Sequence, residues 1–388
     1  MKKQAPKSLT NKNNGTTINA RQLSLFLAFF LPVGKILELP SLLARGAGGD
    51  LLLPAFLGSL LEFAALCALL LFAARSEQSV FERLENAVGK WAARALYGLY
   101  AAYLLCSSAL PILDLEKFSH AAFSDTEPTF FSFTPFFILS GFICTKAFKS
   151  IGRCSDLSPA LFLIPFLGLI LLSVSEADFS SLLPLFEKPF SSSAKTLLHA
   201  LPHFPAGGLL LPLMSGYKYE KGDAKKVLPA FGVGSLLFWV FLAVFYSVYG
   251  TTAAREHYAL AKIAQYFPAL NWIGRIDLLL VYTLTIQLFF FTALPLQLCT
   301  HCVCKTLEKP WQVLVSAALN LALFFAVLFL NRHYDNIYEF FTRSLWWVFL
   351  IFSTVLPLCA PLLAIKKGGG KASTKAKKEE TQCTQKTP

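Results

Sequence analysis

FLPVGKILELP, residues Phe30–Pro40, interrupts an apolar segment that is otherwise long enough to cross a membrane. Pro32 removes a backbone donor, Gly34 permits a non-helical turn, and Lys35 and Glu38 carry charges. In hydrocarbon every backbone polar group needs a partner, so irregular backbone persists only where it lines a cavity or is buried in protein. The stretch therefore predicts an interrupted helix within a larger bundle.

The whole chain has the composition of a membrane protein. Of its 388 residues, 55% are hydrophobic and 15% are charged, whereas soluble domains carry about 25% charged residues. The apolar residues fall in blocks of roughly 20, the length that a helix needs to cross the hydrocarbon. We predict an all-α membrane protein with about ten transmembrane helices, at 20–43, 51–74, 91–113, 134–150, 156–175, 196–219, 227–249, 272–298, 311–330 and 342–365.

The loop charges predict the orientation in the bilayer. With a cytoplasmic N-terminus, Lys and Arg gather in the cytoplasmic segments, so topology rather than nucleic-acid binding explains the net charge of +12. Both termini are then cytoplasmic. We expect a polar N-terminus at 1–19, a permease-like membrane domain at 20–365 and a disordered basic tail at 366–388. Segment 76–90 has the apolar spacing of a short cytoplasmic amphipathic helix.

A second set of helix breakers lies five helices later. LPHFPAGGLLLP, residues 201–212, places Pro202, Pro205, Gly207 and Gly208 in the middle of the sixth predicted helix. Breaks in helices one and six are typical of transporters built from an inverted five-plus-five repeat, whose binding site lies at the midplane between the broken helices. Each break alone could be a packing kink, but their matched positions favour a binding site.

The residues around the first break also follow the pattern of a known family. INARQLSLFLAFFLPVGKILELPSLLARGAGGD, residues 18–50, has a polar lead with Gln, a helix and then a small turn. The matching positions in its helix are Gly34, Ile36, Leu37, Leu39 and Pro40. This stretch resembles the opening of the spore germination permeases, the B subunits of germinant receptors in the amino acid–polyamine–organocation superfamily. Further similar stretches lie at 85–105, 182–189 and 274–290.

The resemblance implies a leucine-transporter-type fold that recognises a small germinant, such as an amino acid, without a cofactor. It also implies a complex with two other germinant receptor subunits, in the spore inner membrane. Lys35 departs from the family pattern, which bears on whether the ligand is an ordinary amino acid. A cation- or proton-coupled amino acid transporter is the alternative, because one sequence does not distinguish flux from signalling.

The two breaks and their neighbours supply the predicted ligand site. Its residues are Pro32, Gly34, Lys35, Phe204, Ala206, Gly207 and Gly208. Glu38 lies one helical turn from Lys35, so this pair could neutralise itself. Glu62, inside the second helix, is a lone carboxylate that could pair with Lys35 or relay protons. A purely structural ion pair is the alternative for these charges, and a satisfied core carboxyl is the alternative for Glu62.

Polar aromatic and amide side chains on other helices are further candidates. Tyr97, Tyr100 and Tyr103 repeat every three residues on the third helix, so their hydroxyls could face the cavity. Tyr282 and Gln287 occupy the eighth helix. Packing or an interfacial aromatic belt is the alternative role for the tyrosines.

One cysteine-rich cluster raises the question of a metal site. CTHCVC, residues 299–304, contains Cys299, His301, Cys302 and Cys304. Structural metal sites usually draw about four ligands from two separated pairs, so we predict no metal here and interpret the cysteines as buried free thiols. The chain also lacks a Walker loop, an HExxH motif and a nucleophile elbow, so we predict that it is not an enzyme.

Overall fold

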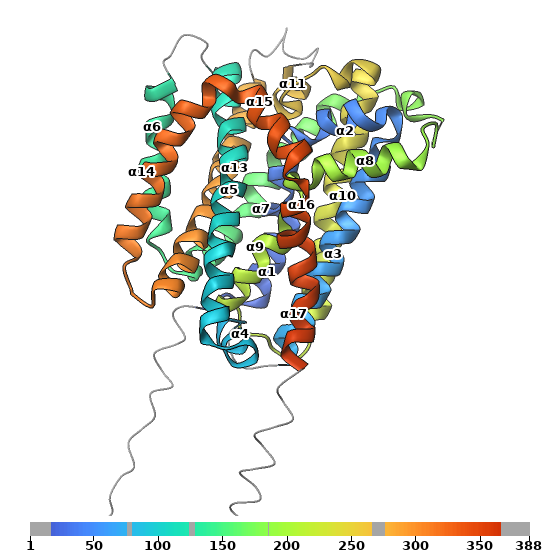
Figure 1. Cartoon of the computed structure of the whole chain (residues 1–388). Helices are drawn as coiled ribbons and strands as arrows, with labels where there is room; N and C mark the ends of the chain where they lie inside the picture. The colour runs from blue at the N-terminus through green and yellow to red at the C-terminus, as the bar shows by residue number, and fades with distance from the viewer. Residues whose placement is uncertain (1–16, 76–79, 124–128, 185, 266–275, 366–388) are drawn as a thin grey trace, which may run out of the picture.

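The computed structural model describes residues 17–75, 80–123, 129–184, 186–265 and 276–365. In these residues the chain is a bundle of helices, with one isolated β-bridge between Ile18 and Tyr217 (Figure 1). The predicted all-α fold class is thus confirmed. Most of the polar N-terminus and the whole basic tail lie outside the described residues, so the domain boundaries stay predictions.

The first and sixth passes are each divided into two half-helices. The first contains α1 (Ala20–Leu25), a π-helical turn at Phe26–Phe30, a 3-10 turn at Pro32–Lys35 and α2 (Leu39–Ala47). The sixth contains α8 (Phe190–Ala200), a 3-10 turn at Leu201–His203 and α9 (Ala206–Leu213). The two interruptions predicted from proline and glycine are therefore present in the structure.

The other passes are longer helices, and two short helices lie at the ends of the bundle. The long ones are α3 (Leu52–Ala74), α5 (Lys90–Phe123), α6 (Thr129–Cys144), α7 (Phe148–Val174), α10 (Ala224–Tyr249), α13 (Ile276–Leu307) and α14 (Gln312–Leu330). The last pass combines α15 (Tyr334–Glu339), α16 (Trp346–Leu350) and α17 (Leu356–Ile365), and the short helices are α4 (Val80–Val88) and α11 (Ala259–Gln265).

Long apolar helices coincide with most of the predicted spans but not with the first, which is divided into short segments. Seven helical segments of the described chain could each cross a membrane by length and composition. Two shorter apolar helices, Thr134–Cys144 and Trp346–Leu362, lie in the fourth and last predicted spans. Helix α4 falls within segment 76–90 and contacts α5 and α17. The chain is therefore an integral membrane protein.

Several predicted boundaries are wrong, and two of them lie where helices pack closely. The fourth and fifth helices are separated at 145–147, not at 151–155, because Gly152 lies inside α7 and lets the Gln22 side chain pack closely. The eighth helix continues to Leu307 rather than ending at 298. In both places small or thiol side chains signal close helix packing and not a loop.

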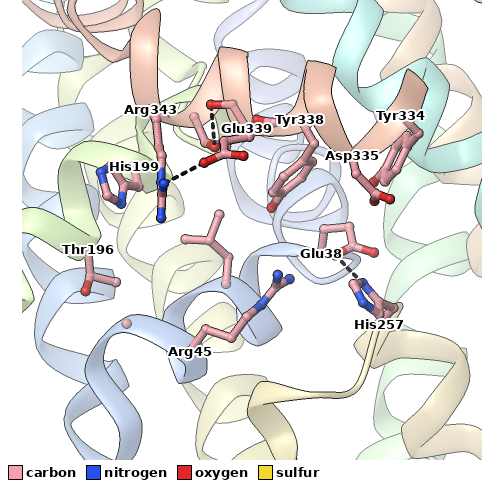
Figure 2. Close-up of a pocket in the computed structure, with 13 residues that line it drawn as sticks. Glu38, Arg45, Thr196, His199, His257, Tyr334, Asp335, Tyr338, Glu339 and Arg343 are labelled. Carbon is pink, nitrogen blue, oxygen red and sulfur yellow. Dashed lines mark hydrogen bonds and ion pairs between the residues drawn. The ribbon is translucent and has the colours of Figure 1, made fainter. Parts of the chain in front are cut away.

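Segments predicted to lie on the same side of the membrane are found at the same end of the bundle. At one end, Lys146, Ser215, His301 and Lys305 line a common pocket. At the other end, α2, α8 and α15 enclose a pocket of about 430 Å³, drawn in Figure 2. The grouping of these segments therefore agrees with the charge pattern. The assignment of one end to the cytoplasm stays a prediction.

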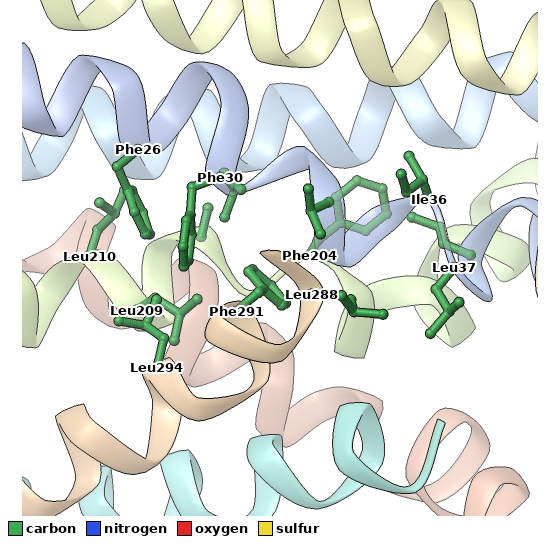
Figure 3. Packing of buried hydrophobic residues seen from close by; sticks show 14 of the residues in the cluster. Phe26, Phe30, Ile36, Leu37, Phe204, Leu209, Leu210, Leu288, Phe291 and Leu294 are labelled. Atoms are coloured by element: carbon green, nitrogen blue, oxygen red, sulfur yellow. The ribbon is translucent and has the colours of Figure 1, made fainter. Parts of the chain in front are cut away.

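A continuous apolar core fills the crossing of the broken helices. Phe30 from the first pass, Phe204 and Leu209 from the sixth, and Phe291 and Leu294 from α13 pack together (Figure 3). Gly34 makes this contact possible, because a Cβ atom there would collide with the Phe291 ring. The glycine thus serves a close approach, and it does so within the 3-10 turn of the break at a φ that is not positive.

Candidate functional site

The first break places one buried cation at the centre of the bundle. Pro32 and Lys35 lie in the 3-10 turn, and α-helical structure resumes only at Leu39. The Lys35 side chain is 4% exposed. A buried ammonium is costly without a partner. The groups around Lys35 must therefore compensate its charge.

Lys35 forms an ion pair with Glu62 of α3, and Glu62 reaches the second break. One carboxylate oxygen of Glu62 contacts the Lys35 ammonium. The other accepts a hydrogen bond from the Ala206 amide at 3.1 Å, at the start of α9. The two breaks are therefore joined by a continuous bridge from Lys35 through Glu62 to Ala206.

Aromatic rings complete the enclosure of the ammonium. Lys35 Nζ lies 4.8 Å from the centroid of Phe204 and 5.7 Å from that of Phe238. Both rings are buried, and the electron-rich face of a ring attracts a cation. Phe204 also packs against Gly58, where no side chain would fit. Phe204, one of the residues predicted for the ligand site, is thus wedged between α3 and the Lys35 ammonium.

Glu38 does not neutralise Lys35, contrary to one sequence-based expectation. Its carboxylate accepts a hydrogen bond from the Tyr258 amide at 3.3 Å and lies 3.8 Å from His257 Nδ1. The backbone between Lys35 and Glu38 is not α-helical, so the spacing that pairs side chains on a helix does not apply. Glu62 therefore lies at the centre of the bundle, whereas Glu38 lies at one end.

The second break ends before the alanine and glycines of the predicted site. Phe204 and Pro205 depart from helical geometry, but Ala206, Gly207 and Gly208 already form the first turn of α9. A Cβ atom on Gly207 would collide with the backbone carbonyl of Ser353, and one on Gly208 would collide with the Tyr103 side chain. Both glycines thus let neighbouring helices approach α9 closely.

The last pass supplies a partner of this break that the sequence does not indicate. A π-helical turn at Ile351–Val355 packs against α9. Ser353 Oγ donates a hydrogen bond to the Phe204 carbonyl at 2.7 Å, which satisfies an acceptor freed by the break. A π-turn leaves no regular mark in an apolar sequence, although such turns are frequent at functional sites.

The three tyrosines of α5 all face the protein interior. Tyr100 donates to the Phe352 carbonyl at 3.1 Å, and Tyr103 stacks on the Phe352 ring at a centroid distance of 4.9 Å. The Tyr103 hydroxyl is buried beside Gly208 and has no hydrogen-bond partner among the described residues. Tyr103 thus brings an unused polar group to the crossing.

The two candidate residues on α13, Gln287 and Tyr282, lie in different surroundings. Gln287 donates to the Phe29 carbonyl at 2.8 Å and so satisfies a backbone group near the first break. Tyr282 is 60% exposed and points away from the centre. Gln287 is therefore a support of the broken helix.

The cysteine cluster lies within α13, where its side chains face different neighbours. Cys299 donates to the Ala101 carbonyl at 3.3 Å, whereas His301 Nε2 lies 3.3 Å from Ser215 Oγ. In the described part of the chain, no group of His, Cys, Asp or Glu side chains has an arrangement that could hold a metal ion. The cluster therefore packs α13 against α5 and the end of the sixth pass.

Comparison with known proteins assigns the family and the fold. The spore permease family model, described as "Spore germination protein", matches residues 18–335. MhsT, solved in complex with L-phenylalanine, has a TM-score of 0.63 at 12% identity, over 90% of this chain and 99% of that chain. Mhp1, a nucleobase-cation-symport-1 family transporter solved closed with bromovinylhydantoin bound, has a TM-score of 0.46 at 13% identity, over 96% and 100%.

No curated protein matches the chain. The similarity to MhsT extends over nearly all of both chains and confirms the leucine-transporter-type fold that the family resemblance implies. The family and the structural neighbours of this chain are permease-type membrane proteins and not enzymes. With a family match over most of its length, the chain belongs to the spore germination protein family of permease-like membrane proteins.

Proposed function

We propose that the chain is the permease-like subunit of a germinant receptor, which binds a small amino acid or similar molecule where the two broken helices cross. The unpartnered Tyr103 hydroxyl carries this proposal, because a buried hydroxyl without a partner costs about 1–3 kcal/mol. A ligand that bonds to it recovers that free energy. The family match supports the germination role, and MhsT, similar in fold, was solved with an amino acid.

The charges at the crossing favour a ligand with a carboxylate. The first N–H groups of α9 have no acceptor within the helix and lie at its positive end. Glu62 already holds the Ala206 amide and the Lys35 ammonium. A ligand carboxylate would compete with Glu62 for these two partners. Such exchange would loosen the bridge between the breaks, which gives binding a direct effect on conformation.

The Lys35 ammonium favours sensing over cation-coupled transport. A fixed positive charge between the breaks can take the place of a bound coupling cation, so binding need not depend on an ion gradient. In this proposal the protein lies in the spore inner membrane with both termini cytoplasmic, and it works with two other receptor subunits. A cation- or proton-coupled amino acid transporter is the competing function.

Two measurements on purified protein separate these functions. The first is thermal unfolding in detergent with each common amino acid, where a ligand present at about 100 times its Kd adds about 2.7 kcal/mol of stability. The second is uptake of the stabilising amino acid into proteoliposomes under a sodium or proton gradient. We expect stabilisation without gradient-driven accumulation. Accumulation would establish the transporter, and no stabilisation by any amino acid would contradict a central amino acid site.

A Tyr103→Phe variant is expected to bind the stabilising amino acid about tenfold more weakly, because it loses one ligand hydrogen bond of about 1 kcal/mol or more. The ring and its stacking on Phe352 remain, so folding is expected to stay intact. Tyr100→Phe is the matched control, since that hydroxyl already donates to the Phe352 carbonyl. Equal affinity in wild type and Tyr103→Phe would remove Tyr103 from the site.

A further inference from the structure

A second polar cavity lies at the end of the bundle where α2, α8 and α15 meet. Its volume is about 430 Å³, within the range of small-molecule sites. Figure 2 shows that its lining comes from both broken passes, from the last pass and from the segment before α11. It is distinct from the crossing, because Glu38 and not Lys35 lines it.

Two opposite charges on α2 face this cavity. Glu38 precedes the first turn and Arg45 lies in the last, seven residues apart, so they share one face of the helix with a Cα separation of about 10 Å. Helical side chains lean toward the N-terminus, which tilts the Arg45 guanidinium toward Glu38. The two nevertheless form no ion pair, and the cavity separates them (Figure 2).

Arg45 is the available cation of the cavity. Within the described residues its side chain makes no ion pair or hydrogen bond, whereas Arg343 is already paired with Glu339. Glu38 is 2% exposed, although its contacts to Tyr258 and His257 are long. The signs of both charges suit the dipole of α2, but the dipole does not account for the hollow between them.

The wall between these charges offers an unused polar group and an apolar surface. The Tyr338 hydroxyl is buried without a partner in the described part of the chain, and Figure 2 shows it pointing into the cavity between Glu38 and Arg343. Leu42 and the Tyr334 ring supply apolar lining. The cavity therefore presents an acid, a cation and a hydroxyl around an apolar surface.

We propose that this cavity, the Glu38–Arg45 pocket, binds a zwitterionic α-amino acid with an apolar side chain. The ammonium of the ligand contacts Glu38, and its carboxylate forms a forked contact with the Arg45 guanidinium. Such a molecule carries both charges at a short separation and bridges two groups that cannot reach each other. Binding in this pocket does not require a ligand at the crossing, so the two sites can be tested separately.

Binding in this pocket is expected to strengthen as pH rises. Contact with the Glu38 carboxylate raises the pKa of His257, and Arg45 and Asp335 also act on this histidine. The charged contact is complete below about pH 6.5 and is lost as pH rises through the raised pKa. Protonated His257 competes with a ligand ammonium for Glu38. L-phenylalanine affinity should therefore increase several-fold between about pH 6 and 8, and His257→Gln should abolish this increase.

The test is calorimetric titration of the full chain in nanodiscs with three probes that share one phenyl group. L-phenylalanine carries both charges, phenethylamine lacks the carboxylate, and hydrocinnamate lacks the ammonium. We expect only L-phenylalanine to bind well. Arg45→Gln should weaken it about tenfold to a hundredfold, as for the loss of a charge-assisted contact. Arg255→Gln is the matched control, because this exposed arginine lies outside the pocket.

The variants separate this pocket from the central site. Loss of L-phenylalanine binding in Arg45→Gln but not in Arg255→Gln or Tyr103→Phe establishes the Glu38–Arg45 pocket. Loss in Tyr103→Phe with no change in Arg45→Gln overturns the pocket and leaves the central site standing. Equal losses in Arg45→Gln and Arg255→Gln, equal binding of the three probes, or no binding of L-phenylalanine by the wild type also overturn it. Arg45 is exposed, so its replacement is not expected to impair folding.

Discussion

A Lys35→Met variant is expected to lose about 3–5 kcal/mol of folding stability, because it leaves the buried carboxylate of Glu62 without its counter-charge. Methionine keeps most of the length of the side chain, so the loss reports the charge and not a cavity. Unfolding of the purified protein in detergent, followed by circular dichroism against wild type, measures the difference.

Removal of the second charge is the control for this experiment. Lys35→Met combined with Glu62→Gln should recover most of the stability, since no unpaired charge then remains in the core. Lys35→Met combined with Glu38→Gln should recover none, because Glu38 contacts His257 and Tyr258 instead. Rescue by Glu38→Gln and not by Glu62→Gln would contradict the Lys35–Glu62 ion pair and assign Glu38 as the partner of Lys35.

A Gly207→Ala variant is expected to lose about 1–3 kcal/mol of stability, the usual cost of overpacking a core. The new Cβ atom meets the backbone carbonyl of Ser353, which cannot rotate away as a side chain could. Helix α9 and the π-turn at Ile351–Val355 must therefore move apart. The same thermal unfolding assay measures the loss, and weaker binding of the stabilising amino acid is expected to accompany it.

Gly232 in α10 is the matched control for this substitution. A Cβ atom at Gly232 meets nothing within 4 Å, so Gly232→Ala should leave stability unchanged or raise it by about 0.5–1 kcal/mol. A Gly207→Ala protein as stable as Gly232→Ala would mean that α9 and the last pass are not in close contact.

The hydrophobic pattern predicts the spans and the breaks because both depend on local signals. Apolar length determines which segments can cross a bilayer, and Pro32 and Pro205 remove backbone donors wherever they lie. The prediction of one cation and two acids near the centre follows from the cost of burying charge. These inferences need no knowledge of which helices are neighbours.

The remaining features depend on contacts between distant residues. Lys35 pairs with Glu62 and not with Glu38 because the backbone after Lys35 is irregular, which residue spacing does not reveal. The Glu38–Arg45 pocket joins α2 to α8, α15 and the segment before α11, and no motif links these four elements. The sequence places Gly34 and Gly207 near the breaks, but the neighbours that approach them, Phe291 and Ser353, come from distant helices.

Binding of a small ligand at the crossing of the two broken helices can be observed directly. An electron cryomicroscopy map of the protein, saturated with the amino acid that raises its unfolding temperature most, tests this directly. We expect ligand density beside the Tyr103 hydroxyl and the first turn of α9, with Phe204 moved away from Lys35. Density found only elsewhere, with the bridge from Lys35 through Glu62 to Ala206 intact, would contradict it.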